Sequence, residues 1–154
     1  MKKIVSIVVS VLICFLVGGS ASYFQADAIR SWYPLLNKPE LTPPNIAFPI
    51  AWSFLYLCMG ISIGLIIDSE NRRKGYLVKL FLIQLFFNFM WSILFFYFQN
   101  PLFGIIDIIL LDTVIILYTL KSYRVYKISS LLFLPYMLWV FFATYLNGYI
   151  LLNN

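Results

Sequence analysis

The sequence predicts an all-α integral membrane protein, a five-transmembrane-helix bundle with a long ordered first loop. Of its 154 residues, 62% are hydrophobic and only 11% are charged, whereas soluble domains carry about 25% charged residues. Several apolar runs reach the ~20 residues that a helix needs to cross about 30 Å of hydrocarbon. Spans and short joints take up nearly the whole chain, so we expect one transmembrane domain over residues 1–154.

The spans are expected to be helices, because a lone strand leaves its backbone unpaired in lipid and these runs are too long for barrel strands. The first span has an alternative interpretation, since Lys2-Lys3, an apolar stretch and Gly19-Ser20-Ala21 resemble a cleaved secretory signal. The apolar character continues through Phe24, which is longer than a signal core usually runs. The five predicted spans are approximately residues 4–24, 48–67, 76–98, 102–120 and 128–152.

Charge distribution predicts the orientation. Nine Lys and Arg residues fall on one side of the predicted spans and two, Arg30 and Lys38, on the other. By the positive-inside rule, the N-terminus is cytoplasmic, and the first loop and the C-terminus lie outside. The nine are Lys2, Lys3, Arg72, Arg73, Lys74, Lys79, Lys121, Arg124 and Lys127.

Composition also excludes several kinds of site. There is no histidine, and Cys14 and Cys58 each stand alone in an apolar run, so neither a metal site nor a disulfide framework is predicted. The net charge of +5 comes from residues at the ends of spans. We therefore expect contact with the lipid bilayer and no nucleic-acid partner.

Residues 25–47 form the one long connection, whereas the joints at 68–75 and 121–127 and at Asn100-Pro101 are short. This loop contains WYPLLNKPELTPP, residues 32–44, in which proline restricts the backbone and lowers the entropy lost on ordering. A long ordered loop among short ones is typical of a functional segment. We predict that it forms a lid.

Three spans carry polar or aromatic side chains at helical spacing. The polar stripe of the third span serves either helix-to-helix hydrogen bonding or a ligand cavity, and the aromatic stripes of the second and fifth serve either packing or the same cavity. If they converge, the pocket lies under the loop. The stripes are Gln84, Asn88 and Ser92 with Trp91 beside them; Trp52, Tyr56 and Met59; and Trp139, Ala143 and Asn147.

Two further features leave alternatives open. Asp107 and Asp112 lie about 140° apart on a helix, so one of them faces inward, as a proton relay or cation site or in a protonated or helix-capping structural role. Gly60 and Gly64 form a GxxxG motif that permits close helix approach, either inside the bundle or between two copies of the chain.

Several motifs in order resemble the TspO/MBR family, the translocator proteins, tryptophan-rich sensory proteins and peripheral-type benzodiazepine receptors, and in particular its bacterial members. The resemblance covers essentially the whole chain. It is carried by WYPLLNKPELTPP in the loop, FPIAWSFLYLCMGIS in the second span, QLFFNFMWSILFF in the third, Asp107 in the fourth and LPYMLWVFFATYLN in the fifth.

The resemblance implies a homodimer in a bacterial cell membrane whose pocket, under the first loop, binds protoporphyrin IX and isoquinoline or benzodiazepine-type drugs. It implies sensory or stress regulation and light-dependent porphyrin degradation, with Trp32 and Trp139 as the redox-active residues and no obligatory cofactor. The ligand-binding residues it implies are Tyr33, Pro43, Phe48, Trp52, Tyr56, Asn88, Phe89, Ser92, Trp139, Phe142 and Ala143.

The alternative function is a small membrane transporter of porphyrin or another amphiphile, although no internal repeat of the kind that many transporters use is visible. The propionates of a porphyrin are expected to seek the loop cations Arg30 and Lys38 or interfacial water. Cholesterol binding is not expected, because no Lys or Arg follows Tyr149.

Overall fold

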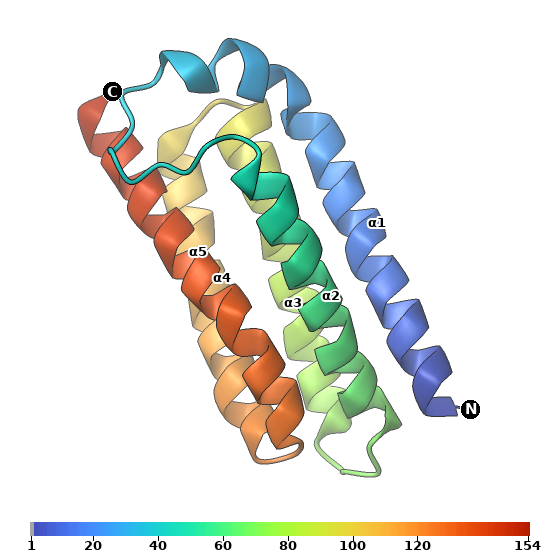
Figure 1. Ribbon diagram of the computed structural model, residues 1–154. Helices are drawn as coiled ribbons and strands as arrows, with labels where there is room; N and C mark the ends of the chain where they lie inside the picture. Colours follow the sequence, from blue (N-terminus) through green and yellow to red (C-terminus); the bar gives the residue numbers. More distant parts are fainter. Residues whose placement is uncertain (1) are drawn as a thin grey trace.

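The computed structural model describes residues 2–154 and folds them into a bundle of long helices (Figure 1). Within these residues, five helices are long and apolar enough to cross a membrane. The predicted fold class, an all-α five-helix membrane bundle, is confirmed. The helices are α1 (Lys2–Ser31), α2 (Ala47–Asp68), α3 (Lys74–Trp91), α4 (Pro101–Tyr123) and α5 (Lys127–Asn153), with a 3-10 turn, η1 (Tyr33–Leu35), and a π-helix, η2 (Ser92–Tyr97).

The two ends of the bundle differ in what they carry. The lid end carries the loop of residues 32–46, the link between η2 and α4, and the C-terminus, and the far end carries the N-terminus and the other two links (Figure 1). α2 packs against α1 and α5, and α4 packs against α3 and α5. The loop therefore extends over the lid end from α1 toward α5 before it enters α2.

Helix α1 continues well beyond the predicted span. It contains 30 residues and ends at Ser31, so it is about 45 Å long and the ordered loop begins at residue 32 rather than 25. The predicted span ends at residue 24 because hydropathy marks only the part of a helix that lies in hydrocarbon, and Gln25, Asp27 and Arg30 are polar. These polar residues do not end a helix, and the alanines among them favour its continuation.

The link between the third and fourth spans is very short. The chain leaves η2 through Gln99, whose φ of 50° lies in the left-handed region. Asn100 then accepts a hydrogen bond at Oδ1 from the Phe103 amide at 3.0 Å, and Pro101 occupies the first turn of α4. Asparagine at the cap and proline in the first turn are the preferred way to begin a helix.

The GxxxG motif is used inside the bundle. A Cβ placed on Gly60 would lie 2.5 Å from Val11 Cα, and one on Gly64 would lie 2.6 Å from Ile7 Cα. The two glycines therefore let α1 and α2 approach backbone to backbone, which resolves the alternative in favour of an internal contact. A homodimer, which remains a prediction, has to use another surface.

The two aspartates of α4 differ in burial. Asp107 is 5% exposed and its Oδ2 has no hydrogen-bond partner among the described residues. Asp112 is half-buried, and its Oδ2 accepts a hydrogen bond from Thr144 of α5 at 2.7 Å. Asp107 is therefore the inward-facing carboxyl group, and Asp112 ties α4 to α5.

Candidate ligand cavity

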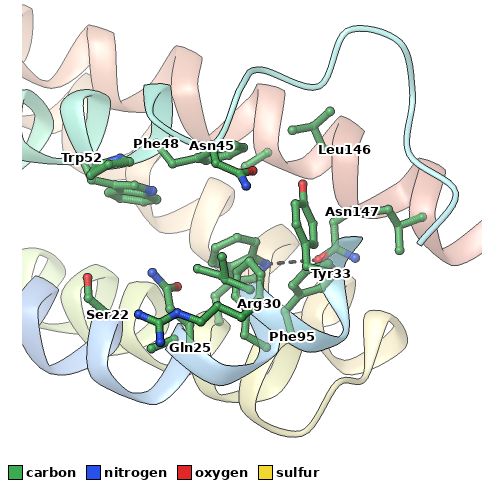
Figure 2. Close-up of a pocket in the computed structure, with 17 residues that line it drawn as sticks. Ser22, Gln25, Arg30, Tyr33, Asn45, Phe48, Trp52, Phe95, Leu146 and Asn147 are labelled. Atoms are coloured by element: carbon green, nitrogen blue, oxygen red, sulfur yellow. Dashed lines mark hydrogen bonds between the residues drawn. The ribbon is translucent and has the colours of Figure 1, made fainter. Parts of the chain in front are cut away.

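A cavity of about 350 Å³ lies at the lid end, beneath the loop (Figure 2). Its lining comes from α1, α2, α5, the loop, and the junction of α3 with η2, whereas α4 contributes no lining residue. Ligand sites usually measure about 300–1,000 Å³ and combine an apolar wall with a few polar groups. The cavity has this form, and each of its walls is built differently.

The first wall is aromatic and comes from the end of α3 and from η2. Trp91 and Phe95 stack with ring centroids 5.4 Å apart and planes 11° apart, and Phe96 meets Phe95 edge to face at 4.8 Å. Residues five apart diverge by about 140° on a regular α-helix. The i→i+5 winding of a π-helix brings Trp91 and Phe96 to one face. The π-helix thus places three rings along the cavity.

Asn147 of α5 fixes this wall. Its Oδ1 accepts a hydrogen bond from Trp91 Nε1 at 3.1 Å, and its Nδ2 donates one to the Pro101 carbonyl oxygen at 2.9 Å. The side chain is 1% exposed, so both polar groups are satisfied out of water. Gly104 of α4 makes room for it, since a Cβ there would lie 2.8 Å from Asn147 Oδ1 and 2.9 Å from the Phe95 ring.

The second wall comes from the start of α2, where Phe48, Pro49 and Trp52 line the cavity. The Trp52 indole stacks on the Tyr56 ring at 5.4 Å. Beneath it, the Tyr56 hydroxyl donates a hydrogen bond to Asn88 Oδ1 at 3.0 Å, and Asn88 Nδ2 donates one to the hydroxyl of Tyr136 at 3.1 Å. Trp52 is therefore supported from below by hydrogen bonds that connect α2, α3 and α5.

The third wall is the last part of α1, and it carries most of the polarity. Gln25 accepts a hydrogen bond at Oε1 from the Ser92 hydroxyl at 3.4 Å, which ties α1 to η2. Arg30 is the only charged residue among the lining residues. Figure 2 shows Arg30 and Gln25 across the cavity from Phe48 and Trp52. This wall is formed by Ser22, Gln25, Ala26, Ile29 and Arg30.

The loop closes the cavity through Tyr33, which is 8% exposed and packs on Phe96 with ring centroids 5.6 Å apart. Lys38 donates a hydrogen bond to the Tyr33 carbonyl oxygen at 2.7 Å, and its ammonium group lies 4.7 Å from the centre of the Tyr33 ring. Burial raises the pKa of the Tyr33 phenol above its ordinary value. Lys38 is thus engaged with the loop, which leaves Arg30 as the cation that faces the cavity.

The structure brings part of the predicted ligand site together at this cavity. Tyr33, Phe48, Trp52 and Ala143 line it directly. Tyr56 and Asn88 lie under Trp52, and Ser92 reaches the cavity through Gln25. Trp32 packs against Phe95 with ring centroids 5.5 Å apart and does not line the cavity itself.

Four other predicted residues lie elsewhere. Trp139 and Phe142 line a shallow groove between α2 and α5 on the outside of the bundle. Phe48 lies between Trp139 and the cavity, and the ring centroids of these two residues are 6.0 Å apart. Phe89 lines another outer groove, between α1 and α3, and packs edge to face on Phe24. Pro43 is partly exposed in the loop and does not line the cavity.

Several lining residues lie outside the predicted ligand site. Asn147 belongs to the fifth-span stripe and Trp91 lies beside the polar stripe, but helical spacing does not show that the two side chains meet. Phe95 and Phe96 depend on the π-helix, for which the sequence gives no signal. The lining residues of α1 lie mostly beyond the predicted span, and the rest are Asn45, Pro49, Leu146 and Ile150.

The cavity is lined mainly by aromatic rings and uncharged polar groups. Its lining contains no carboxyl, thiol or imidazole group, and among residues 2–154 no cluster of three metal-ligating side chains is present. The lining offers a set of flat rings, the seven amide, hydroxyl or indole groups of Ser22, Gln25, Tyr33, Asn45, Trp52, Trp91 and Asn147, and one guanidinium, that of Arg30. Such a lining suits a planar, largely apolar molecule that carries an anionic group.

Comparison with known proteins identifies the family of this chain. The model of the TspO/MBR family matches residues 10–152. The chain is 41% identical to the tryptophan-rich protein TspO of Archaeoglobus fulgidus over 152 residues, which is 99% of each chain. It is 38% identical to the protein of the same name from Chlorobaculum tepidum, covering 99% of this chain and 98% of that one.

More distant relatives carry other names. The human translocator protein is 26% identical over 87% of this chain and 79% of its own length. A tryptophan-rich sensory protein of Cereibacter sphaeroides is 28% identical over 75% of this chain. Because the family model and the two near relatives span almost the whole sequence, this chain belongs to the TspO/MBR family.

Proposed function

We propose that this protein is a membrane receptor for tetrapyrroles, with protoporphyrin IX as the ligand class, and that it serves sensory or stress regulation. The cavity supports this function, because Trp52, Trp91 and Phe95 offer flat ring faces and Arg30 offers the one positive charge of its lining. A porphyrin is a flat macrocycle with carboxylate groups at one edge. Ring faces bind the macrocycle, and a guanidinium pairs with a carboxylate in a bidentate manner.

Isoquinoline and benzodiazepine-type molecules are flat and apolar as well, so the same aromatic walls are proposed to accept them. Such ligands lack the carboxylates and would not use Arg30. The charge distribution supports an orientation with the lid end outside, because Arg30 and Lys38 are the only Lys or Arg residues near that end while nine lie toward the far end.

Light-dependent porphyrin degradation stays a prediction about this protein. The indoles on the cavity wall are Trp52 and Trp91, while Trp32 and Trp139 each lie one ring behind it, against Phe95 and Phe48. A reaction that needs contact between macrocycle and indole would therefore use the first pair, with molecular oxygen as the oxidant. The second pair could act only through a neighbouring ring.

The test is a titration of the purified protein with protoporphyrin IX and, separately, with its dimethyl ester, followed by quenching of tryptophan fluorescence. We expect both to bind, and we expect Arg30→Gln to weaken binding of the free acid about tenfold and of the ester hardly at all. Lys38→Gln removes the same charge from the loop and is the matched control, with an expected change below about threefold for either ligand.

The outcomes of this titration and two further measurements distinguish porphyrin binding, degradation and transport. No binding of either porphyrin by the wild type would overturn the proposal. Equal effects of Arg30→Gln on acid and ester would remove Arg30 as the carboxylate partner. Illumination of the complex in the presence of oxygen then reports on degradation, and porphyrin uptake into sealed vesicles that contain the protein would favour the transporter instead.

A further inference from the structure

The cavity is closed on three sides and open on the fourth. On the walls from η2 and α5, Phe95, Asn147 and Ile150 are each no more than 2% exposed. By contrast, four lining residues on the α1 and α2 side are exposed, namely Ser22 and Arg30 on α1, Pro49 in the first turn of α2, and Asn45 at the end of the loop just before α2. The open side is therefore the gap between the lid-end halves of these two helices.

The gap follows from residue size along the facing helices. Toward the far end, Gly60 and Gly64 bring α1 and α2 into backbone contact, and Gly18 leaves room for the Tyr56 ring. Closer to the lid end, α2 carries the large side chains of Trp52 and Phe48 instead of glycines, so the backbones of α1 and α2 are held further apart.

No side-chain hydrogen bond closes the gap within residues 2–154. The hydroxyls of the serines on both sides bond to the backbone of their own helix, from Ser20 to Leu16, from Ser31 to Asp27 and from Ser53 to Pro49. The one described side-chain bond from this part of α1 to another element joins Gln25 to η2. The two helices can therefore separate here without breaking a hydrogen bond between them.

The loop above the cavity is held more firmly. The Asn154 side chain accepts a hydrogen bond from the Asn37 amide at 2.8 Å and donates one to the Asn37 carbonyl oxygen at 3.2 Å. Lys38 bonds to the Tyr33 carbonyl oxygen, and the Tyr33 ring packs on Phe96. Opening the loop would break both hydrogen bonds to Asn154 and pull the buried Tyr33 ring away from Phe96.

We propose that the ligand enters the cavity sideways from the lipid bilayer, between α1 and α2, while the loop stays closed. Large apolar side chains flank the opening and face outward, with Tyr23 81%, Ile46 67% and Ile50 65% exposed, so it meets lipid. Arg30 lies about 12 Å beyond Ser22 along α1. An amphiphile dissolved in the leaflet presents its apolar body near Ser22 and its anionic group near Arg30.

This route rests on the proposed function for its ligand and is tested by kinetics. Ser22→Cys with Pro49→Cys, joined by a short bismaleimide, bridges the gap, and Asn37→Cys with Asn154→Cys, joined in the same way, bridges the loop to α5. Wild type treated with the reagent is the control for the two native cysteines, which are both buried. Protein in vesicles is mixed with protoporphyrin IX-loaded vesicles, and the rate of tryptophan quenching is followed.

We expect the α1–α2 bridge to slow both binding and release at least about tenfold, equivalent to about 1.4 kcal/mol in barrier height, and the loop bridge to leave both rates within about twofold. Slowing by the loop bridge, alone or together with the other, would overturn the proposal. So would unchanged rates in both bridged proteins.

A second measurement needs no porphyrin and separates this inference from the proposed function. A bimane label on Ser22→Cys should be quenched by brominated lipid more strongly than by aqueous iodide, and a label on Leu41→Cys in the exposed loop should show the reverse. If iodide quenches the label at position 22 more strongly, the opening faces water and the lateral route is wrong, whether or not porphyrin binds.

Discussion

The two ends of this bundle are built from the same helices, but the far end is tightly packed and the lid end encloses a cavity. At the far end, α2 and α5 are joined by a reciprocal pair of hydrogen bonds, from Ser62 Oγ to the Ser129 carbonyl oxygen at 2.8 Å and from Ser129 Oγ to the Ser62 carbonyl oxygen at 3.0 Å. The Tyr118 hydroxyl lies 3.0 Å from Ser62 Oγ, so α4 joins them. All three side chains are completely buried.

At the lid end, large rings replace these small residues. Trp52 and Phe48 on α2 face Trp91 and Phe95 across the cavity, so the helices enclose space instead of packing on one another. Both ends are apolar, and hydrophobicity alone does not distinguish them. Whether a pair of membrane helices forms a core or a cavity is decided here by the size of the facing side chains, because interhelical packing in lipid depends on close approach.

The far-end contact should be the more sensitive to added volume. Gly60→Ala places a methyl group against the backbone of α1 at Val11, and we expect it to destabilise the folded protein by about 1–3 kcal/mol. Gly19→Ala is the matched control, because nothing lies within 4 Å of its Cβ and alanine favours the helix. Unfolding in mixed micelles by a denaturing detergent measures both, and equal midpoints for the two variants would contradict tight packing between α1 and α2.

At the lid end, the size of Trp52 should matter for ligand binding. Trp52→Ala removes a ring face from the wall, and we expect it to weaken binding of protoporphyrin IX about tenfold, or about 1.4 kcal/mol. Trp139→Ala removes the same volume from the outer groove, and the expected loss is below about threefold. The fluorescence of the porphyrin itself gives both affinities. A larger effect at Trp139 would place the ligand in the groove between α2 and α5.

Much of the lid end could be predicted from the sequence, because the spacing of polar and aromatic residues within one helix is a local pattern. The stripe of Trp52 and Tyr56 and the stripe of Gln84, Asn88 and Ser92 follow from helical spacing, and the structure joins Tyr56 to Asn88. The same spacing places Gln84 inside the core, where neither of its amide atoms has a partner among residues 2–154. Periodicity thus identifies the inward face of a helix but not what each side chain meets.

The other parts of the site depend on structural features that no short stretch of sequence reveals. Phe96 reaches the cavity only because the chain winds as a π-helix, and Arg30 does so only because α1 continues past the end of its apolar run. The resemblance implies that Trp139 and Phe142 belong to the site, whereas in the structure both line the outer groove between α2 and α5. Such placements follow from tertiary packing, which no window of sequence contains.

A smaller effect is expected at Gly104, where the aromatic wall meets α4. Gly104→Ala pushes against Asn147 Oδ1 and Phe95, so the hydrogen bond to Trp91 should lengthen and the wall should shift. We expect about a threefold loss of porphyrin affinity, on the order of 0.7 kcal/mol, and a shift in tryptophan emission. Gly148→Ala has its nearest contact at 3.9 Å and should change neither. Equal behaviour of the two variants would mean that the wall tolerates displacement.

The smallest effect is expected for the hydrogen bond beneath Trp52, which contributes either to the stability of the bundle or to ligand binding. Tyr56→Phe keeps the ring under Trp52 but removes the hydroxyl that donates to Asn88, so a buried amide oxygen loses its partner. A side-chain hydrogen bond between membrane helices is worth about 0.6 kcal/mol on average, and we expect destabilisation of that size, measured by detergent unfolding. Tyr145→Phe, at an exposed position, should leave the midpoint unchanged. If Tyr56→Phe lowers porphyrin affinity without lowering stability, its hydroxyl acts on the ligand through Trp52 rather than on the bundle.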